Sequence, residues 1–243
     1  MSTQLCYLWH SGVALLLDDL SIVIDYYEDS DGGHAGILHD RILRRGVPLY
    51  VLSTHFHHDH YTPEIFAFEA PHITYILSRD IAEQRGATLS RHDQLHFIAR
   101  GETFDDGRLR AEAFGSTDEG SSFAVHAGGQ SFFHAGDLNN WHWMERRGER
   151  EWRAAEARFL AEAEYIRQRL PQCDVVMFPV DPRLGSEYMR GAAQFLERIR
   201  CRFFCPLHFD LAYEQARAFA PCAAEHGATL LNITHRGQLF TLE

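Results

Sequence analysis

Cysteine is scarce in this chain, and the few copies are not spaced as pairs. The five cysteines are Cys6, Cys173, Cys201, Cys205 and Cys222, an odd number without any CxxC pair. The strand-like segment "RCRFFCPLHF" contains two of them, Cys201 and Cys205, so we expect buried thiols there and not a metal-binding pair. This usage excludes a disulfide framework and predicts a reducing compartment, the cytoplasm.

Long apolar runs are also missing. No run approaches the roughly 20 residues that span a bilayer. The N-terminal "MSTQLCYLWHSG" has no basic region followed by an apolar core. We therefore expect neither a membrane partner nor a signal peptide.

Basic residues are the minority charge. The chain has 34 acidic against 23 basic side chains, a formal net charge of -11. An acidic surface argues against a nucleic-acid partner, so a small-molecule substrate is expected. Motifs of other enzyme classes are absent as well, since the sequence contains neither GxxxxGK[ST] nor GxSxG. The composition does not define the oligomeric state.

Linkers and low-complexity segments are absent too, which predicts one domain over residues 1–243. Strand and helix patterns alternate, which predicts an α/β fold with sheets inside and helices outside. Helices are predicted at residues 37–46, 63–70, 79–86, 149–170 and 186–200. Gly46 would cap the first helix, and Thr62 with Pro63 would begin the second. Strands are predicted at residues 4–12, 13–19, 20–27, 47–54, 73–78, 95–101, 108–116, 121–129, 131–137, 173–180 and 201–209, with a terminal strand pair over 229–242.

Histidine is abundant where these other features are missing. The stretch "STHFHHDHYT", residues 53–62, holds four histidines and an aspartate in six consecutive positions. His55 and His57 are two apart, a spacing that a helix would place on different faces, so a loop must bring them together. The apolar run "LYVLST" delivers this loop at the carboxyl end of a strand, where open α/β sheets place ligands. Imidazole and carboxylate donors here predict a metal site.

This pattern resembles the metallo-β-lactamase fold superfamily, whose signature motif is HxHxDH. The segment "VALLLDDLSIVIDYY" is similar to the superfamily's opening hairpin and a strand ending in Asp25. "FFHAGD" is similar to a later strand ending in Asp137, and "FFCPLHF" to a closing strand that carries His208. The resemblance covers nearly the whole chain and implies a four-layer αβ/βα sandwich. Order and spacing resemble the ascorbate-6-phosphate lactonase-like branch.

The resemblance also implies the metal ligands. They are His55 and His57 for a first metal, Asp59, His60 and His208 for a second, and Asp137 as a bridge. His58 occupies the variable position of the motif and is not expected to be a ligand. The implied cofactor is one or two divalent ions, with zinc first and manganese or iron as alternatives.

One ligand of the superfamily is missing. A further first-site histidine normally lies in an "H-[ST]-x-G" turn, but here "FGSTDEGSSFAV" places Thr117 at its position. Asp118 could serve as an oxygen ligand, the first metal could be held by two histidines and Asp137, or only the second site could fill. His142, five residues after Asp137, could also fold back to complete a site. A carboxylate ligand would favour manganese or iron over zinc.

Further polar residues are candidates for the pocket. His10 ends the first strand, and Arg183 in "PVDPRLG" could take a phosphate or carboxylate bidentately. A backbone hydrogen bond for His10 and a salt bridge for Arg183 are the structural alternatives. We assign His10, Arg183 and His142 to substrate binding, and expect Asp25 to support a metal-bound histidine.

These features predict a metal-dependent hydrolase of a small-molecule ester, lactone or phosphoester. A bound divalent metal lowers the pKa of water from about 15.7 to near 7, which makes hydroxide available. Asp59 would orient that hydroxide and return a proton to the leaving group. The alternatives are a phosphodiesterase or nuclease of the same fold, and a non-hydrolytic metal-binding protein such as an iron redox or sensor module.

Overall fold

The computed structural model describes residues 3–85 and 94–243, so the last residue of the helix predicted at 79–86 lies outside the described residues. Two compact units divide the chain: unit 1 comprises Met1–Ala99 and Ile233–Glu243, and unit 2 comprises Arg100–Asn232. Each unit contains one seven-stranded sheet. The predicted α/β class is confirmed, while the single domain stays a prediction. No helix in these described ranges is both long and apolar enough to cross a membrane.

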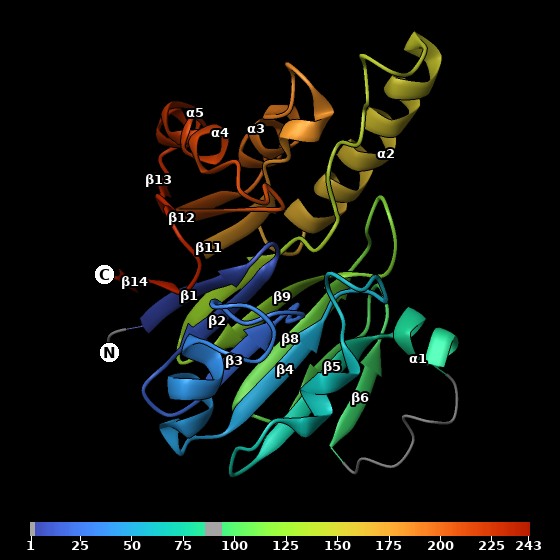
Figure 1. The fold of residues 1–243 in the computed structure, drawn as a ribbon. Helices are drawn as coiled ribbons and strands as arrows, with labels where there is room; N and C mark the ends of the chain where they lie inside the picture. Colours follow the sequence, from blue (N-terminus) through green and yellow to red (C-terminus); the bar gives the residue numbers. More distant parts are fainter. Residues whose placement is uncertain (1–2, 86–93) are drawn as a thin grey trace. The chain divides into compact units, whose positions relative to one another are not determined.

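Unit 1 is built on a mixed sheet in the order β14-β1-β2-β3-β4-β5-β6 (Figure 1). Its strands are β1 (Thr3–Trp9), β2 (Gly12–Leu16), β3 (Ser21–Ile24), β4 (Leu49–Ser53), β5 (Ile73–Ser78), β6 (Leu95–Ile98) and β14 (Gln238–Leu242). β14, β1, β2 and β3 pair antiparallel, and β3 to β6 pair parallel. The strands β1, β3 and β4 therefore end at the same edge of the sheet.

Short helical segments cover one face of this sheet. They are η1 (Leu38–Ile42), η2 (Leu43–Arg45), η3 (Pro63–Ala67) and α1 (Arg79–Arg85). Leu38, Ile65 and Ile81 from these segments join a buried cluster with alternate strand residues such as Val23 and Val51. Two predicted helix ends are confirmed. Gly46 ends η2 with a φ of 72°, and Thr62 caps the start of η3, where its side chain accepts a hydrogen bond from the Glu64 amide.

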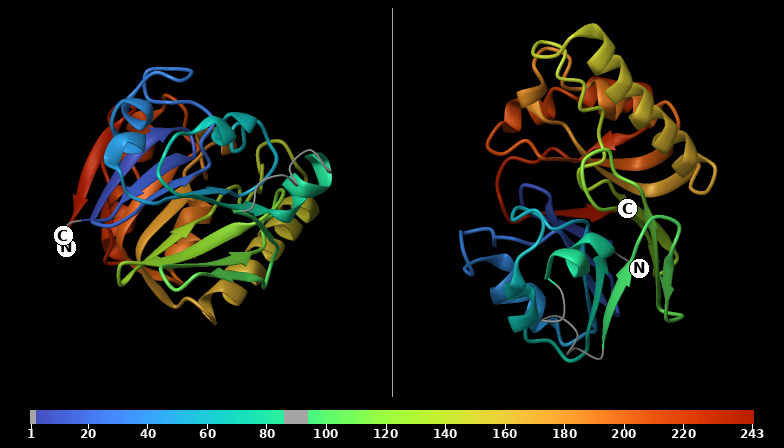
Figure 2. Two further views of the ribbon diagram at one scale, coloured as in Figure 1. Left: turned by 90° about the horizontal axis from the view of Figure 1, so that it is seen from below. Right: turned by 90° about the vertical axis from the view of Figure 1, so that its right-hand side faces the viewer.

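Unit 2 has a second mixed sheet, in the order β13-β12-β11-β10-β9-β8-β7. Its strands are β7 (Thr103–Asp105), β8 (Leu109–Phe114), β9 (Ser122–Ala127), β10 (Gln130–His134), β11 (Gln172–Pro179), β12 (Arg200–Leu207) and β13 (Thr229–Leu230). The helices are α2 (Glu149–Arg167), η5 (Pro182–Leu184), α3 (Arg190–Leu196), α4 (Tyr213–Arg217) and α5 (Ala220–Glu225). Figure 2 shows these helices on the same face of the strands β11 and β12. β10 to β13 run parallel, so their carboxyl ends share one edge.

The core of unit 2 is a group of aromatic rings between the sheet and its helices. The Phe178 ring lies 4.8 Å from that of Phe195 and 6.1 Å from that of Phe159, and Phe133 stacks on Phe195 at 5.0 Å. All four side chains are fully buried. They connect α2 and α3 to the strands β10 and β11. These two strands lead into the candidate site residues Asp137 and Arg183.

Truncating this group is expected to destabilise the protein strongly. Phe178→Ala should lower the free energy of unfolding by about 3–5 kcal/mol, because it removes a large buried ring and leaves a cavity. Urea unfolding measures the change, and Phe178→Leu, which leaves a smaller cavity, should lose less. Equal stability of Phe178→Ala and the wild type would show that this group is not a core.

One predicted element is wrong. Residues 229–242 do not form a strand pair: β13 pairs parallel with β12, whereas β14 pairs antiparallel with β1. Residues 231–237 carry the chain from one sheet to the other, so the two short strands have different partners. The helix predicted at 186–200 is also shorter, since α3 covers only Arg190–Leu196 and turns flank it.

Candidate metal centre

The candidate residues follow the carboxyl ends of strands in each unit. In unit 1, His10 follows β1, Asp25 follows β3, and the histidine cluster follows β4. In unit 2, Asp137 lies three residues after β10, and His208 directly follows β12. Strand ends at one edge of an α/β sheet are where such folds place ligands. Each sheet therefore gathers its own set of candidate donors.

The backbone at these strand ends is unusual. His10, Asp25 and His208 have positive φ values of 56°, 51° and 61°. Residues other than glycine seldom adopt this left-handed conformation, which costs about 1–3 kcal/mol each and clusters at functional sites. The strain at three candidate residues therefore supports a functional role for both strand-end sets.

In unit 1, imidazole and carboxylate groups lie close together. His55 Nε2 is 3.0 Å from His57 Nδ1. His10 Nε2 is 3.4 Å from Asp59 Oδ2, and ligand atoms of His10, Asp59 and His60 lie within 4.8 Å of one another. The His58 side chain is 92% exposed, and its Nδ1 lies 3.8 Å from Asp59 Oδ1. His10 thus lies among the predicted ligands.

Asp25 binds Thr54 and His60 and so supports this cluster. Its fully buried carboxylate accepts hydrogen bonds from the Thr54 amide at 2.7 Å and the Thr54 hydroxyl at 2.7 Å. Its Oδ2 also lies 2.8 Å from His60 Nδ1. An ionised carboxylate can only accept, so Nδ1 of His60 carries the proton and Nε2 becomes the metal-donor nitrogen. The support predicted for Asp25 is present in this geometry.

Unit 2 repeats the same arrangement with another pair. His208 Nδ1 lies 3.0 Å from Asp181 Oδ2, and His208 Nε2 lies 3.3 Å from Asp137 Oδ1. Arg183 Nη2 is also 3.0 Å from His208 Nδ1, but that nitrogen can either donate or accept. We assign its proton to the bond with Asp181, because the buried carboxylate is the better acceptor and Arg183 already binds Asp181 through two nitrogens.

Two carboxyl groups are held ionised. Burial would raise the pKa of Asp181, but hydrogen bonds from His208 and Arg183 outweigh burial and lower this pKa to about 2. Burial would likewise raise the pKa of Asp59, yet its hydrogen bond with His10 and its interaction with His60 hold that pKa below the usual range. Both groups therefore carry negative charge at neutral pH, as a cation site requires.

The donor sets fit a divalent metal. Two ligands of one tetrahedral ion, each about 2.1 Å from it, lie about 3.4 Å apart. The pairs His55–His57 and His208–Asp137 are separated by 3.0 and 3.3 Å. Nitrogen and carboxylate donors together suit zinc, iron and manganese.

Thr117 has a structural role at the position of the missing histidine. Its hydroxyl donates a hydrogen bond to the Asn139 carbonyl at 2.6 Å and accepts one from the Asn139 amide at 3.0 Å. This reciprocal pair ties the segment after β8 to the loop that follows Asp137. Asp118, the predicted oxygen ligand, is exposed and lines the same cavity as Asp137.

Thr117→Val is expected to lower the free energy of unfolding by about 1–3 kcal/mol, because it leaves the Asn139 amide and carbonyl without their partner. Thr117→Ser keeps the hydroxyl and should retain most of the stability. Urea unfolding of both variants measures the difference. If valine and serine behaved alike, the two hydrogen bonds would not matter.

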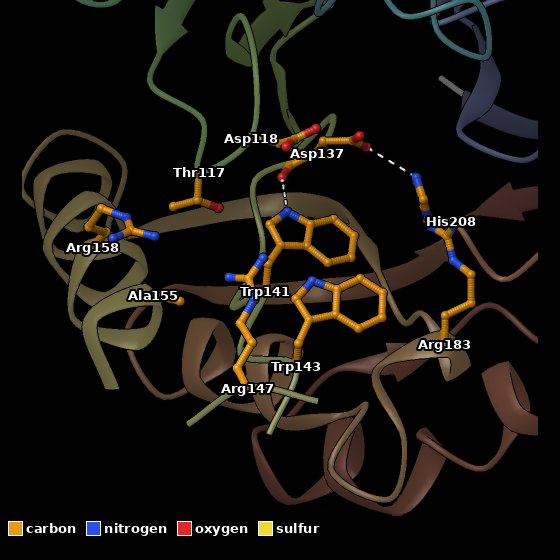
Figure 3. A pocket seen from close by; sticks show the side chains of 10 residues that line it. All are labelled: Thr117, Asp118, Asp137, Trp141, Trp143, Arg147, Ala155, Arg158, Arg183 and His208. Atoms are coloured by element: carbon orange, nitrogen blue, oxygen red, sulfur yellow. Dashed lines mark hydrogen bonds and ion pairs between the residues drawn. The ribbon is translucent and has the colours of Figure 1, made fainter. Parts of the chain in front are cut away.

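A cavity of about 270 Å³ opens beside Asp137 and His208 in unit 2 (Figure 3). Its remaining lining residues are Thr117, Asp118, Trp141, Trp143, Arg147, Ala155, Arg158 and Arg183. Arg183, predicted for substrate binding, therefore lines the cavity, although its guanidinium is bound to Asp181. Sequence reasoning missed Arg147 and Arg158 because nothing in a charged, helix-forming segment distinguishes them from other exposed arginines.

The structure does not bring His142 to this cavity. Its Nε2 lies 3.2 Å from the Glu187 carbonyl, and its Nδ1 accepts a hydrogen bond from the Met144 amide. Burial lowers its pKa. Both ring nitrogens serve the local backbone, so this geometry does not support the predicted role of His142 in substrate binding or as an extra ligand.

No family model matches this chain. A UPF0173 metal-dependent hydrolase of Symbiobacterium thermophilum is 25% identical over 208 residues, which is 80% of this chain and 82% of the relative. The solved structure of Igni18, a metallo hydrolase from the archaeon Ignicoccus hospitalis, has a TM-score of 0.70 at 17% identity and covers 100% of this chain and 99% of its own.

Two further structures share the fold. The metallo-β-lactamase fold protein YhfI from Bacillus subtilis matches with a TM-score of 0.58 and 9% identity, over 98% of this chain and 99% of its own. CmlA, a diiron β-hydroxylase from Streptomyces venezuelae, matches with a TM-score of 0.65 and 13% identity, over 100% of this chain and 54% of its own. These likenesses confirm the predicted metallo-β-lactamase type of fold.

Proposed function

We propose that the chain is a metallo-hydrolase of the metallo-β-lactamase superfamily, as its similarity to a metal-dependent hydrolase and its shared fold support, and that it hydrolyses a small-molecule ester, lactone or phosphoester. One observation carries this proposal above the others. His60 and His208, in separate strand-end sets, each have Nδ1 held by a buried carboxylate, Asp25 or Asp181. Carboxylate–histidine pairs of this kind orient metal ligands and raise their basicity.

The proposed ligands are those implied by the resemblance. His55 and His57 would hold one ion, Asp59, His60 and His208 would hold another, and Asp137 would be a further ligand. Asp118 is proposed as the oxygen ligand in place of the absent histidine, because its carboxylate lines the cavity that also contains Asp137. This donor set would accept zinc, manganese or iron.

A bound divalent ion would supply hydroxide at neutral pH, because it lowers the pKa of water to near 7. The chain's own residues would orient the reactants. Asp59 is ionised and its side chain is 27% exposed, so it can accept a hydrogen bond from the attacking water. It would take the proton of that water and return it to the leaving oxygen. His10, 3.4 Å from Asp59, would hold the carboxylate in position.

The substrate and setting are part of the same proposal. The net charge of -11 favours a small molecule over a polynucleotide. The five thiols are unbridged, and burial raises the pKa of Cys6 and Cys201 to about 12, which keeps them unreactive in the reducing cytoplasm that we propose.

Chelation tests the proposal. The purified protein should hydrolyse members of a panel of lactones, aryl esters and phosphodiesters, and lose this activity after treatment with a chelator. Zinc, manganese or iron added back to the dialysed protein should restore it. Hydrolysis that persists in metal-depleted protein would refute a metal-dependent mechanism.

A second candidate is a non-hydrolytic iron protein. The position of the superfamily histidine is held by Thr117 with the Asp118 carboxylate beside it, and oxygen donors suit iron. The fold is shared with a diiron β-hydroxylase. Iron in the protein as purified, together with oxygen consumption and no hydrolysis of the panel, would favour this candidate. Iron-free protein that hydrolyses the panel would exclude it.

A further inference from the structure

The cavity of unit 2 has two chemically different ends. The acids Asp118 and Asp137 lie together at one side, with His208 next to Asp137 (Figure 3). Arg147 and Arg158 lie away from His208, and their guanidinium groups point toward the space between them and Trp141. Arg147 and Arg158 thus line a different part of this space of about 270 Å³ from the candidate metal ligands, whereas Arg183 lies beside His208.

The two arginines at the cavity differ from most of their neighbours. Arg153, Arg167 and Arg190, along and near α2, pair with Glu149, Glu164 and Glu156. Among residues 3–85 and 94–243, the guanidinium groups of Arg147 and Arg158 have neither an ion-pair nor a hydrogen-bond partner. The chain has 34 acidic and 23 basic side chains, so the absence of a carboxylate partner at these two arginines does not reflect a shortage of acidic residues.

Two indole rings form an apolar wall of the cavity, between the arginine pair and His208 (Figure 3). Trp141 and Trp143 stack with ring centroids 6.2 Å apart and an interplanar angle of 15°. The Trp141 indole donates a hydrogen bond to the Asp137 carbonyl at 2.8 Å, and its ring lies 5.6 Å from that of His208. The wall is therefore fixed directly to the segment that carries Asp137.

The loop behind this wall is held in place before any ligand binds. Glu156 accepts hydrogen bonds from Asn140, Arg190 and Gln194 at 3.2, 2.7 and 2.6 Å. A side chain at Gly191 would lie 1.9 Å from Asn139 Oδ1, so α3 approaches the loop as closely as glycine allows. Pre-formed cavities with precisely placed polar groups are typical of small-molecule sites.

We propose that this cavity is the substrate subsite for an anionic aryl compound, with Arg147 and Arg158 binding its carboxylate or phosphate. Guanidinium groups match the geometry of both oxyanions and bind them bidentately. The planar apolar part would lie against Trp141 and Trp143, with the bond to be cleaved toward Asp137 and His208. The proposal rests on the proposed hydrolase function, which it refines to anionic aryl esters and phosphoesters.

Binding to chelator-treated full-length protein tests the subsite without turnover. In calorimetric titrations, phenyl phosphate or benzoate should bind at least about 10-fold more tightly than neutral benzamide, since charge-assisted hydrogen bonds are at stake. The tighter of the two anions identifies the oxyanion. The double variant Arg147→Gln/Arg158→Gln should lose this preference, whereas Arg153→Gln, on the same helix and paired with Glu149, should keep it.

Equal binding of the anions and benzamide by the wild type would overturn the subsite, as would an unchanged preference in the double variant with a native circular dichroism spectrum. These outcomes are separable from failure of the proposed function. A protein that binds anions through the two arginines but hydrolyses no ester would retain the subsite and lose the hydrolase.

Discussion

His60→Ala is expected to abolish hydrolysis, with kcat/KM falling by at least about 10³-fold, more than 4 kcal/mol of transition-state stabilisation. The imidazole is fully buried, and Asp25 fixes its Nδ1 as a donor. Removing it takes away a proposed metal ligand and leaves the Asp25 carboxylate buried with one partner fewer. Steady-state kinetics at saturating metal measure the loss.

His58 supplies the matched control for this variant. It is a histidine two positions away in the same loop, but its side chain is 92% exposed. His58→Ala should keep wild-type kcat/KM within about twofold, because a long ion pair of 3.8 Å between an exposed imidazole and Asp59 contributes little. Similar losses in both variants would mean that the loop as a whole matters, and that the ligand assignment is wrong.

Asp25→Asn is expected to weaken metal binding by about 10- to 100-fold, because partners that orient a metal-bound histidine typically contribute this much. Asparagine keeps the shape of the side chain but removes the charge that holds the proton on His60 Nδ1. A competition titration with a fluorescent chelator measures the affinity. Activity should recover when excess metal compensates for the weaker site, which a merely unfolded protein would not show.

Asp29 provides a control with the same burial. Its carboxylate is also fully buried in unit 1 and accepts hydrogen bonds from the Leu38 and His39 amides, away from the histidine loop. Asp29→Asn should reduce stability without changing the affinity for metal. An equal loss of metal affinity in both variants would assign Asp25 to folding alone.

The parts of the site that sequence predicts are those carried by a short stretch at a strand end. HxHxDH follows an apolar strand, so its residues converge on one loop, and Asp25 ends a neighbouring strand. In unit 1 the structure brings His55 to His57 and Asp25 to His60. The strands themselves were predictable because continuous apolar runs mark parallel strands buried on both faces.

The parts that escaped prediction depend on partners distant in the chain. The Thr117 hydroxyl is hydrogen-bonded to the backbone of Asn139, 22 residues later, and nothing near position 117 indicates this contact. In the sequence, Glu156 looks like any other polar residue of an amphipathic helix. In the structure its carboxylate accepts hydrogen bonds from Asn140 and Gln194, which are 16 and 38 residues away. Likewise, β13 and β14 look like a hairpin because each is a short strand near the other, while their partners lie in different sheets.

The metal content of protein purified without added metal tests the central claim most directly. Elemental analysis should find one or two divalent ions per chain, and both His60→Ala and His208→Ala should retain less than the wild type. His58→Ala should retain the full amount. Wild-type protein that binds no divalent metal, or a content unchanged in His60→Ala and His208→Ala, would contradict the account.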